Sequence, residues 1–453
     1  SMGRHPLTQS GPRARGQAAL ARSAFAAALA TTAASSSLWA FAGQPLPRHL
    51  AAEIGSNARF LRGARHASSL QGRAGTAQRR VKVAYVEELV KHPRLPVWPA
   101  WFGIFYILLD LITGRPDWGA KLEDMFGGRV CPMIFDNTRA SDPFLLVAHH
   151  RHSFNVFDPF RYIFRSVLMP EGFPAHPHRG FETVTYVLRG GLVHRDSFGI
   201  KKSYGAPPSA DGSGEGGAVQ WMTAGRGLMH EEMWRTGSAT DNSDQELFQI
   251  WVNLPSRAKM VQPRMQLLGA SEGQGRSSFA EVRELGPVPH VEPSPGVIVR
   301  VIAGSADGVA SPVDTFSEMA ILHVTLAAGA EWRWPRAIGW TCIIYTRRGD
   351  VEVAGRTVPV HSTVRLDRES EVVMLKGGPE GGDILLLAGA PLGEPIEMGA
   401  NIVMNSRQEL AQASTDMRFG AFGPVWEHTE DDESWIGRVS AHWGQLGLGV
   451  RKP

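Results

Sequence analysis

The sequence predicts an all-β protein built from sandwiches or barrels. It contains 50 glycines and 30 prolines among 453 residues, and residues that break helices this often favour turn-rich β-structure over a helical bundle. From about residue 129 onward, short apolar runs recur between Gly, Pro, Asp and Asn. Examples are ETVTYVL at 182–188, ELFQIWV at 246–252 and AILHVTL at 320–326. β-branched and aromatic residues dominate these runs, which is typical of strands at regular spacing.

Shifts in composition divide the chain into five predicted parts. These are a targeting or disordered leader at 1–82, an apolar arm or helix at 83–124, a first β-domain at 125–270, a second β-domain at 295–425 and a tail at 426–453. A Pro-rich stretch that ends in PVPHVEPSP at 287–295 connects the two β-domains. One helix is expected, over 406–417, because Ser406 and Glu409 have the spacing of a capping box.

The basic character of the protein belongs to its leader. Residues 1–82 carry twelve basic side chains and a single acid, Glu53, whereas the remainder has 35 basic and 43 acidic residues. The acidic body argues against direct binding of nucleic acid. Basic residues, then the uncharged run at 23–40, then an Arg- and Ser-rich stretch are typical of targeting segments.

The junction LWA-FAGQPLP at 38–47 resembles that of the bipartite presequences of algae with secondary plastids. We therefore expect a plastid location, with the mitochondrion or the cytoplasm as alternatives. The apolar run at 97–113 is too short to span a bilayer. An arm packed on the following domain is the favoured interpretation of this run, and contact with a membrane surface is the alternative.

Two pairs of potential metal ligands lie about fifty residues apart. His176 and His178 are two residues apart, so on one strand both imidazoles face the same side. His230 and Glu232 repeat this spacing after a Gly-rich turn. On facing strands, these pairs would present three nitrogens and one oxygen to a first-row divalent metal such as Fe, Mn, Ni, Co, Cu or Zn.

Spacing leaves the carboxylate ligand open. Glu182 follows His178 by four residues, so it is expected on the same strand face, where it competes with Glu232 as the carboxylate ligand. The further cluster His149, His150 and His152 is interpreted as loop residues.

The segments HPHRGFETVTYVLRG at 176–190 and QWMTAGRGLMHEEM at 220–233 resemble the defining stretch of the pirin family. The similarity continues in FQIWVNLPSRAKMVQP at 248–263 and APLGEPIEMGANIVMNSRQEL at 390–410, and covers about 130–420. The resemblance implies two tandem cupin barrels, the second without metal. It also implies that His176, His178, His230 and Glu232 hold the metal, with Fe(II) as the expected ion, and that Glu182 is not a ligand.

The resemblance implies two classes of function. The first is a quercetin 2,3-dioxygenase-like enzyme that acts on a small aromatic substrate with O2, where the metal is a Lewis acid and Glu232 a general base. Trp221, Met222 and Met229 would then line an apolar pocket, unless they are core residues. The second is a non-enzymatic, iron- and redox-dependent regulatory protein that binds a protein partner.

Overall fold

The computed structural model describes residues 81–92, 95–97, 111–112, 114, 128–134, 138–154, 172–205, 217–236, 243–273, 280–399 and 401–446. The leader predicted at 1–82 lies almost entirely outside the described residues, as does most of the apolar run at 97–113. The targeting function and the membrane contact therefore stay predictions. In the described part of the chain, no helix has the length and apolarity that crossing a bilayer requires.

Two antiparallel-rich sheets form the N-terminal barrel. The larger has the strand order β14-β12-β9-β6-β11-β4-β3-β2 and the smaller the order β13-β8-β7-β10-β5. The strands of the larger sheet are β2 (Leu95–Val97), β3 (Gly128–Ile134), β4 (Phe144–Phe154), β6 (Phe181–Arg189), β9 (Ala218–Thr223), β11 (Ser243–Asn253), β12 (Arg264–Leu268) and β14 (Glu281–Glu284). Those of the smaller sheet are β5 (Gly172–His178), β7 (Gly191–Asp196), β8 (Lys201–Gly205), β10 (Leu228–Trp234) and β13 (Ser271–Glu272). Two short helices accompany them, α4 (Thr138–Ser141) and η2 (Ser256–Ala258).

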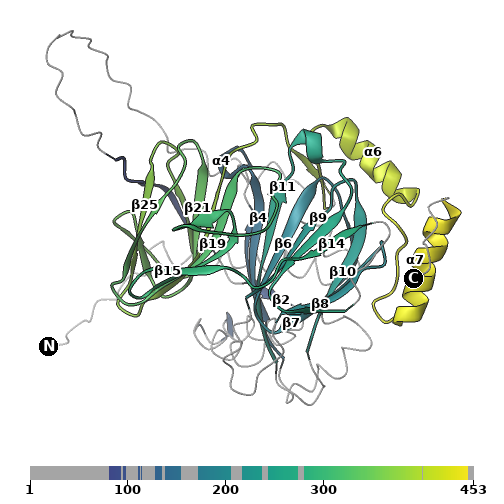
Figure 1. Ribbon diagram of the computed structural model, residues 1–453, viewed down its shortest axis with the longest axis horizontal. Coiled ribbons are helices and arrows are strands. Elements are labelled where there is room, and N and C mark those ends of the chain that lie inside the picture. The colour runs from purple at the N-terminus through teal and green to yellow at the C-terminus, as the bar shows by residue number, and fades with distance from the viewer. Residues whose placement is uncertain are drawn as a thin grey trace, which may run out of the picture. The chain divides into compact units, whose positions relative to one another are not determined.

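A second pair of sheets forms the C-terminal barrel, with the orders β1-β24-β21-β26-β19-β16-β15 and β20-β25-β22-β23. The strands of the larger sheet are β1 (Val86–Lys91), β15 (His290–Ser294), β16 (Val297–Ala303), β19 (Met319–Leu326), β21 (Thr341–Arg348), β24 (Ser362–Leu366) and β26 (Gly382–Gly389). The smaller sheet contains β20 (Glu331–Pro335), β22 (Val351–Val353), β23 (Arg356–Val358) and β25 (Val372–Gly377). Four short strands complete the description, namely β17 (Ser305–Ala306), β18 (Val309–Ala310), β27 (Glu397–Gly399) and β28 (Ile402–Met404). This architecture confirms the predicted all-β class with two tandem barrels (Figure 1).

The larger sheets of the two barrels share a hydrophobic core. In β6, Val184 and Tyr186 point into this shared core, where they join Ile343 and Tyr345 of β21. The alternate residue Val187 belongs to a separate cluster with Tyr204 and Trp234 of the N-terminal barrel. Because neighbouring side chains of a strand point to opposite faces, β6 separates the shared core from the interior of the N-terminal barrel.

Residues 86–91 correct the expectation of an apolar arm or helix. They form β1, which pairs antiparallel with β24 of the C-terminal barrel, Leu89 opposite Val364. Only Val86 and Leu89 are half-buried in β1, and its other residues are exposed, which suits the edge of a sheet. The start of the described chain thus completes the second barrel rather than leading into the first.

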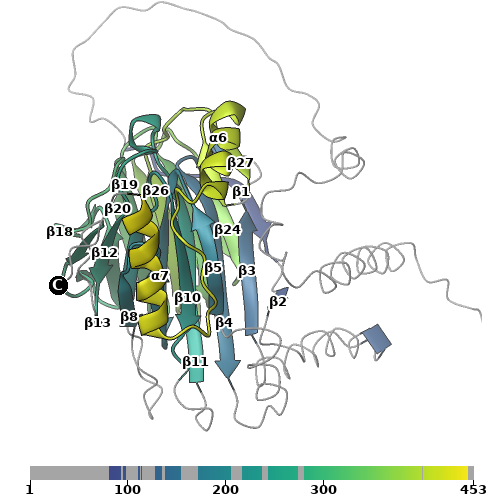
Figure 2. The same ribbon diagram turned by 90° about the vertical axis from the view of Figure 1, so that its right-hand side faces the viewer.

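The predicted helix at 406–417 is confirmed as α6 (Arg407–Arg418), where Ser406 accepts a hydrogen bond from the Glu409 backbone N–H. The expected tail instead contains a second helix, α7 (Asp432–Gln445), capped by Asp431. Trp435, Val439 and Trp443 of α7 are buried against the N-terminal barrel. Figure 2 shows α7 in front of the smaller N-terminal sheet, beside β8 and β10.

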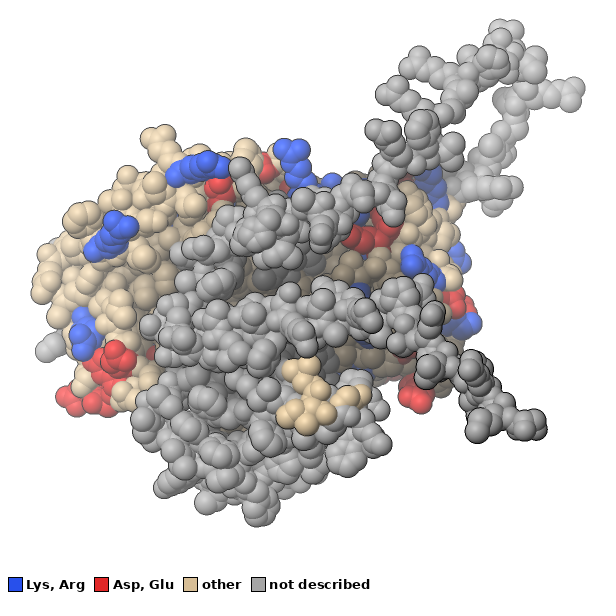
Figure 3. All heavy atoms as spheres, turned by 180° about the vertical axis from the view of Figure 1, so that it is seen from behind, with Lys and Arg blue, Asp and Glu red and all other residues tan. Residues whose placement is uncertain are grey.

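The described surface carries mixed charge. On the face shown in Figure 3, Lys and Arg side chains alternate with Asp and Glu over the coloured part of the molecule. That part of the face therefore has no extended basic patch of the kind that tracks a nucleic-acid backbone.

Candidate metal centre

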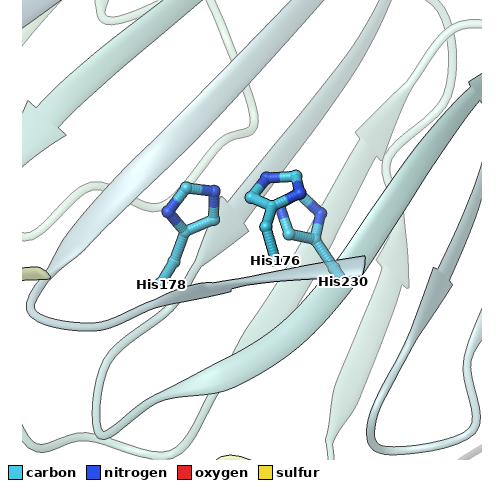
Figure 4. Close-up of side chains that lie close together, drawn as sticks. All are labelled: His176, His178 and His230. Carbon is cyan, nitrogen blue, oxygen red and sulfur yellow. The ribbon is translucent and has the colours of Figure 1, made fainter. Parts of the chain in front are cut away.

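Strands β5 and β10 bring three histidines together in the N-terminal barrel. They pair antiparallel, with His230 opposite His176 and Leu228 opposite His178. One ring nitrogen from each histidine lies within 4.8 Å of the others. Figure 4 shows the three rings projecting from β5 and β10 toward a common region. The two-residue spacing therefore places both β5 imidazoles on the same strand face, as the sequence predicted.

The donor set fits a divalent first-row metal. The Nδ1 of His176 lies 2.7 Å from the carbonyl oxygen of Pro174. Because a carbonyl only accepts, Nδ1 carries the proton and Nε2 keeps a lone pair. The Nε2 of His230 is buried and has no hydrogen-bond partner among the described residues. A buried nitrogen without a partner is unfavourable, and a metal ion at this position would satisfy it.

Desolvation keeps these imidazoles neutral. It lowers the pKa of His176, and it lowers the pKa of His230 well below the usual value, assisted by the neighbouring His176 and His178. Only the neutral imidazole binds a metal. The site is therefore ready to take up a cation near neutral pH without first releasing protons.

Glu232 lies in the same barrel interior but outside the group of three nitrogens. Its Oε1 accepts hydrogen bonds from the Tyr204 hydroxyl at 2.7 Å and the Thr185 hydroxyl at 2.9 Å. Its Oε2 accepts from the Gln249 amide at 3.2 Å. Since a carboxylate has about four acceptor sites, Oε2 retains the capacity for one more partner.

Glu182 does not compete for the same position. The chain turns at Gly180, where φ is +83° and a side chain would collide with the Val403 carbonyl oxygen. Glu182 therefore lies in a new strand, β6, where it shares a face with Val184 and accepts a hydrogen bond from Thr223 at 2.6 Å. The interior face of β6 instead presents Thr185 to Glu232. Counting residues from His178 was wrong because a turn separates the two strands.

The cluster His149, His150 and His152 is also not in a loop. All three are buried in β4. His149 contacts Glu246 and Tyr345 at the junction of the barrels. His150 and His152 face the other way, where His150 packs edge-on against Phe173 and His152 against Trp234.

Trp221, Met222 and Met229 are core residues, which confirms the alternative to the pocket lining. Trp221 belongs to the shared core between the barrels, and Met222 and Met229 pack with the C-terminal segment. Phe181 and Trp251 lie beside the metal centre instead, with ring centroids 5.0 and 5.6 Å from that of His178. Aromatic positions next to the histidines were detectable only once the turn at Gly180 was known.

Sequence reasoning passed over His194 and Asp196. Both are buried in β7, and His194 lies 3.4 Å from His230. The signal was present, because His-x-Asp has the same two-residue spacing as the two recognised pairs.

Two tandem barrels with a histidine cluster inside the first define a bicupin of the metal-binding class. The family models agree: the model described as pirin matches residues 128–252, and that of the pirin C-terminal cupin domain matches residues 321–423. The chain belongs to the pirin family.

Named relatives and a solved structure support this assignment. Pirin of Rattus norvegicus is 35% identical over 305 residues, which cover 66% of this chain and 87% of the relative. Human pirin is 37% identical over 254 residues, covering 55% of this chain and 77% of the relative. The crystal structure of quercetin 2,3-dioxygenase from Acinetobacter baumannii matches with a TM-score of 0.54 and 28% identity, over 66% of this chain and 93% of that chain.

Proposed function

We propose that this protein is a dioxygenase that uses O2 to oxidise flavonol-like aromatic substrates. We further propose that His176, His178, His230 and Glu232 hold its metal, with Fe(II) as the ion. The observation that carries the proposal is the convergence of three imidazole nitrogens within 4.8 Å. The likeness to a quercetin 2,3-dioxygenase supports the choice of substrate class.

The bound ion supplies Lewis acidity toward a phenolic oxygen of the substrate. The chain supplies the remaining elements. Phe181 and Trp251 form an aromatic wall beside His178, with 4.7 Å between their own ring centroids. Such a wall suits a flat aromatic molecule, which gains both buried area and ring–ring contact.

We assign to Glu232 the role of accepting the substrate hydroxyl proton. Tyr204, Thr185 and Gln249 hold its carboxylate in place, so little reorganisation is needed when the substrate enters. When the entering substrate displaces Glu232 from the ion, the free acceptor capacity on Oε2 would take up this proton.

An oxygen-electrode assay tests the proposal. We expect the Fe(II)-loaded protein to consume O2 with quercetin, and His176→Ala and His230→Ala to lose both metal and O2 consumption. His290→Ala is the matched control, because His290 is an exposed histidine of the C-terminal barrel. Loading with Mn, Ni, Co, Cu and Zn in parallel tests the choice of metal.

A wild-type protein with stoichiometric Fe(II) that consumes no O2 with quercetin or a panel of flavonols and catechols would contradict the enzymatic proposal. That result would favour the regulatory alternative, in which the metal controls binding to a partner protein.

A further inference from the structure

We propose that Asp196 and His194 are positioning residues that fix the tautomer of His230, so that its Nε2 lone pair faces the metal. The inference rests on the metal site of the proposed function and names two residues outside its ligand set.

The register of β7 and β10 sets these side chains on one face. Asp196 lies opposite His230, and His194 lies opposite Glu232. Residues directly opposite in an antiparallel pair point to the same side, so all four side chains face the barrel interior. His194 and His230 are both fully buried, and Asp196 is 3% exposed.

The Asp196 carboxylate anchors this arrangement. Its Oδ1 accepts hydrogen bonds from the backbone N–H groups of Phe198 at 2.8 Å and Ile200 at 3.0 Å. These bonds hold the turn between β7 and β8. Its other oxygen, Oδ2, lies 3.4 Å from Nε2 of His194.

These contacts determine which ring nitrogen of His194 and of His230 carries the proton. The Oδ2 atom of Asp196 accepts, so Nε2 of His194 carries the proton and donates. In this tautomer of His194 the Nδ1 is bare, and it lies 3.4 Å from Nδ1 of His230. The Nδ1 of His230 must therefore be the donor in this contact, and its Nε2 is left with the lone pair.

That nitrogen is the buried Nε2 without a hydrogen-bond partner among the described residues. His176 reaches the same tautomer by a different route, through the Pro174 carbonyl. Two of the three histidines thus have Nε2 prepared as a ligand by partners behind the ring. Partners of this kind orient ligands in metalloproteins, and their loss weakens metal binding about 10- to 100-fold.

Replacing Asp196 by Asn should reverse the direction of both hydrogen bonds, the one between residue 196 and His194 and the one between His194 and His230. If the new side-chain amide of Asp196→Asn donates to Nε2 of His194, then His194 donates from Nδ1, and Nε2 of His230 receives the proton. We expect Asp196→Asn and His194→Leu each to weaken Co(II) or Ni(II) binding about 10- to 100-fold in a chelator competition. His194→Asn should retain most of the affinity, because its amide oxygen occupies roughly the place of Nδ1.

A double-mutant cycle separates this role from a merely structural one. If Asp196 acts through His194, Asp196→Asn should add no further loss in the His194→Leu background. If Asp196 only holds the turn, the two losses should add, which would overturn the proposal. Asp350→Asn is the matched control, because Asp350 also accepts a backbone N–H, that of Val360, in the C-terminal barrel.

Long-range ¹H–¹⁵N spectra of histidine-labelled protein at pH 8 measure the tautomer directly, without metal. We expect the Nδ1–H form of His230 in the wild type and the Nε2–H form in Asp196→Asn. An Nε2–H form in the wild type would overturn the inference, as would unchanged metal affinity in both variants.

These readouts do not depend on oxygenase activity. Weaker metal binding by the variants of an inert wild type would support the inference and contradict the catalytic proposal. A wild type that binds none of the tested metals would contradict both.

Discussion

Arg347 of the C-terminal barrel and Glu246 of the N-terminal barrel form a buried ion pair, with 2.9 Å between Nη1 and Oε1 and side chains only 1% and 3% exposed. The same guanidinium donates from Nε and Nη2 to the two oxygens of Asp383, both at 2.7 Å. One cation thus bridges two buried carboxylates across the junction of the barrels.

Arg347→Met should strongly destabilise the protein, because it leaves Glu246 and Asp383 buried with less compensation. Breaking a buried pair in this way costs about 3–5 kcal/mol. The free energy of unfolding in urea would measure this loss. Arg333→Met is the control, since Arg333 is exposed on β20. If Arg347→Met lowered the free energy of unfolding as little as Arg333→Met, the stabilising role of the Arg347 bridge would be contradicted.

Stability should fall in acid for the same reason. Desolvation would raise the pKa of Glu246, but the hydrogen bond from His149 and the charge of Arg347 outweigh it and hold the pKa far below the usual range. The pKa of Asp383 is depressed in the same way by His323 and Arg347. Depressed carboxyl pKa values stabilise the fold above the unfolded value of about 4, and this contribution is lost as the pH falls below it.

Urea titrations between pH 6 and pH 2.5 would test this, with a steep decline expected in the wild type. Glu246→Gln should be less stable at pH 6 and show a shallower decline. Equal slopes in both proteins would contradict the assignment.

The buried carboxyl of Glu182 should lower the stability of the fold as the pH rises, whereas Glu246 and Asp383 lower it as the pH falls. Desolvation raises its pKa to about 7, despite the hydrogen bond from Thr223. A raised carboxyl pKa stabilises the fold below the unfolded value, and this contribution is lost as the pH rises toward 7. Ionisation of Glu182 therefore costs up to about 3 kcal/mol at pH 8.

Glu182→Gln should stabilise the metal-free protein by about 1–3 kcal/mol at pH 8 and little at pH 4.5. Gln keeps an oxygen to accept from Thr223. Denaturation at both pH values measures the difference, with the exposed Glu380→Gln as control. A loss of stability at pH 8 would show that the carboxylate itself is required.

Helix α7 should contribute directly to the stability of the N-terminal barrel. Trp443 stacks on Phe198 with 5.2 Å between ring centroids, and its indole N–H donates to the Ser197 carbonyl at 2.6 Å. Trp443→Ala should cost about 3–5 kcal/mol. Urea denaturation and proteolysis of the segment before α7 would detect the undocking, with the half-exposed Ile436→Ala as comparison.

The sequence alone determined the features that depend on short stretches of chain. Alternation along β5 fixed His176 and His178 on one face, and the Ser406–Glu409 spacing fixed the start of α6. The all-β class followed from the same local patterns. The helical repeat of Trp435, Val439 and Trp443 was equally local and was overlooked.

Only the tertiary structure showed that Glu182 does not share a strand face with His178, because the turn at Gly180 restarts the alternation before Glu182. It also placed β1 beside β24 and His194 behind His230. These contacts join residues up to some 280 positions apart. They depend on the register of the strands and on the burial of side chains across whole sheets. No short-range pattern encodes these long-range pairings, so the histidine-bearing strands could be predicted from the sequence while the partners of the histidines could not.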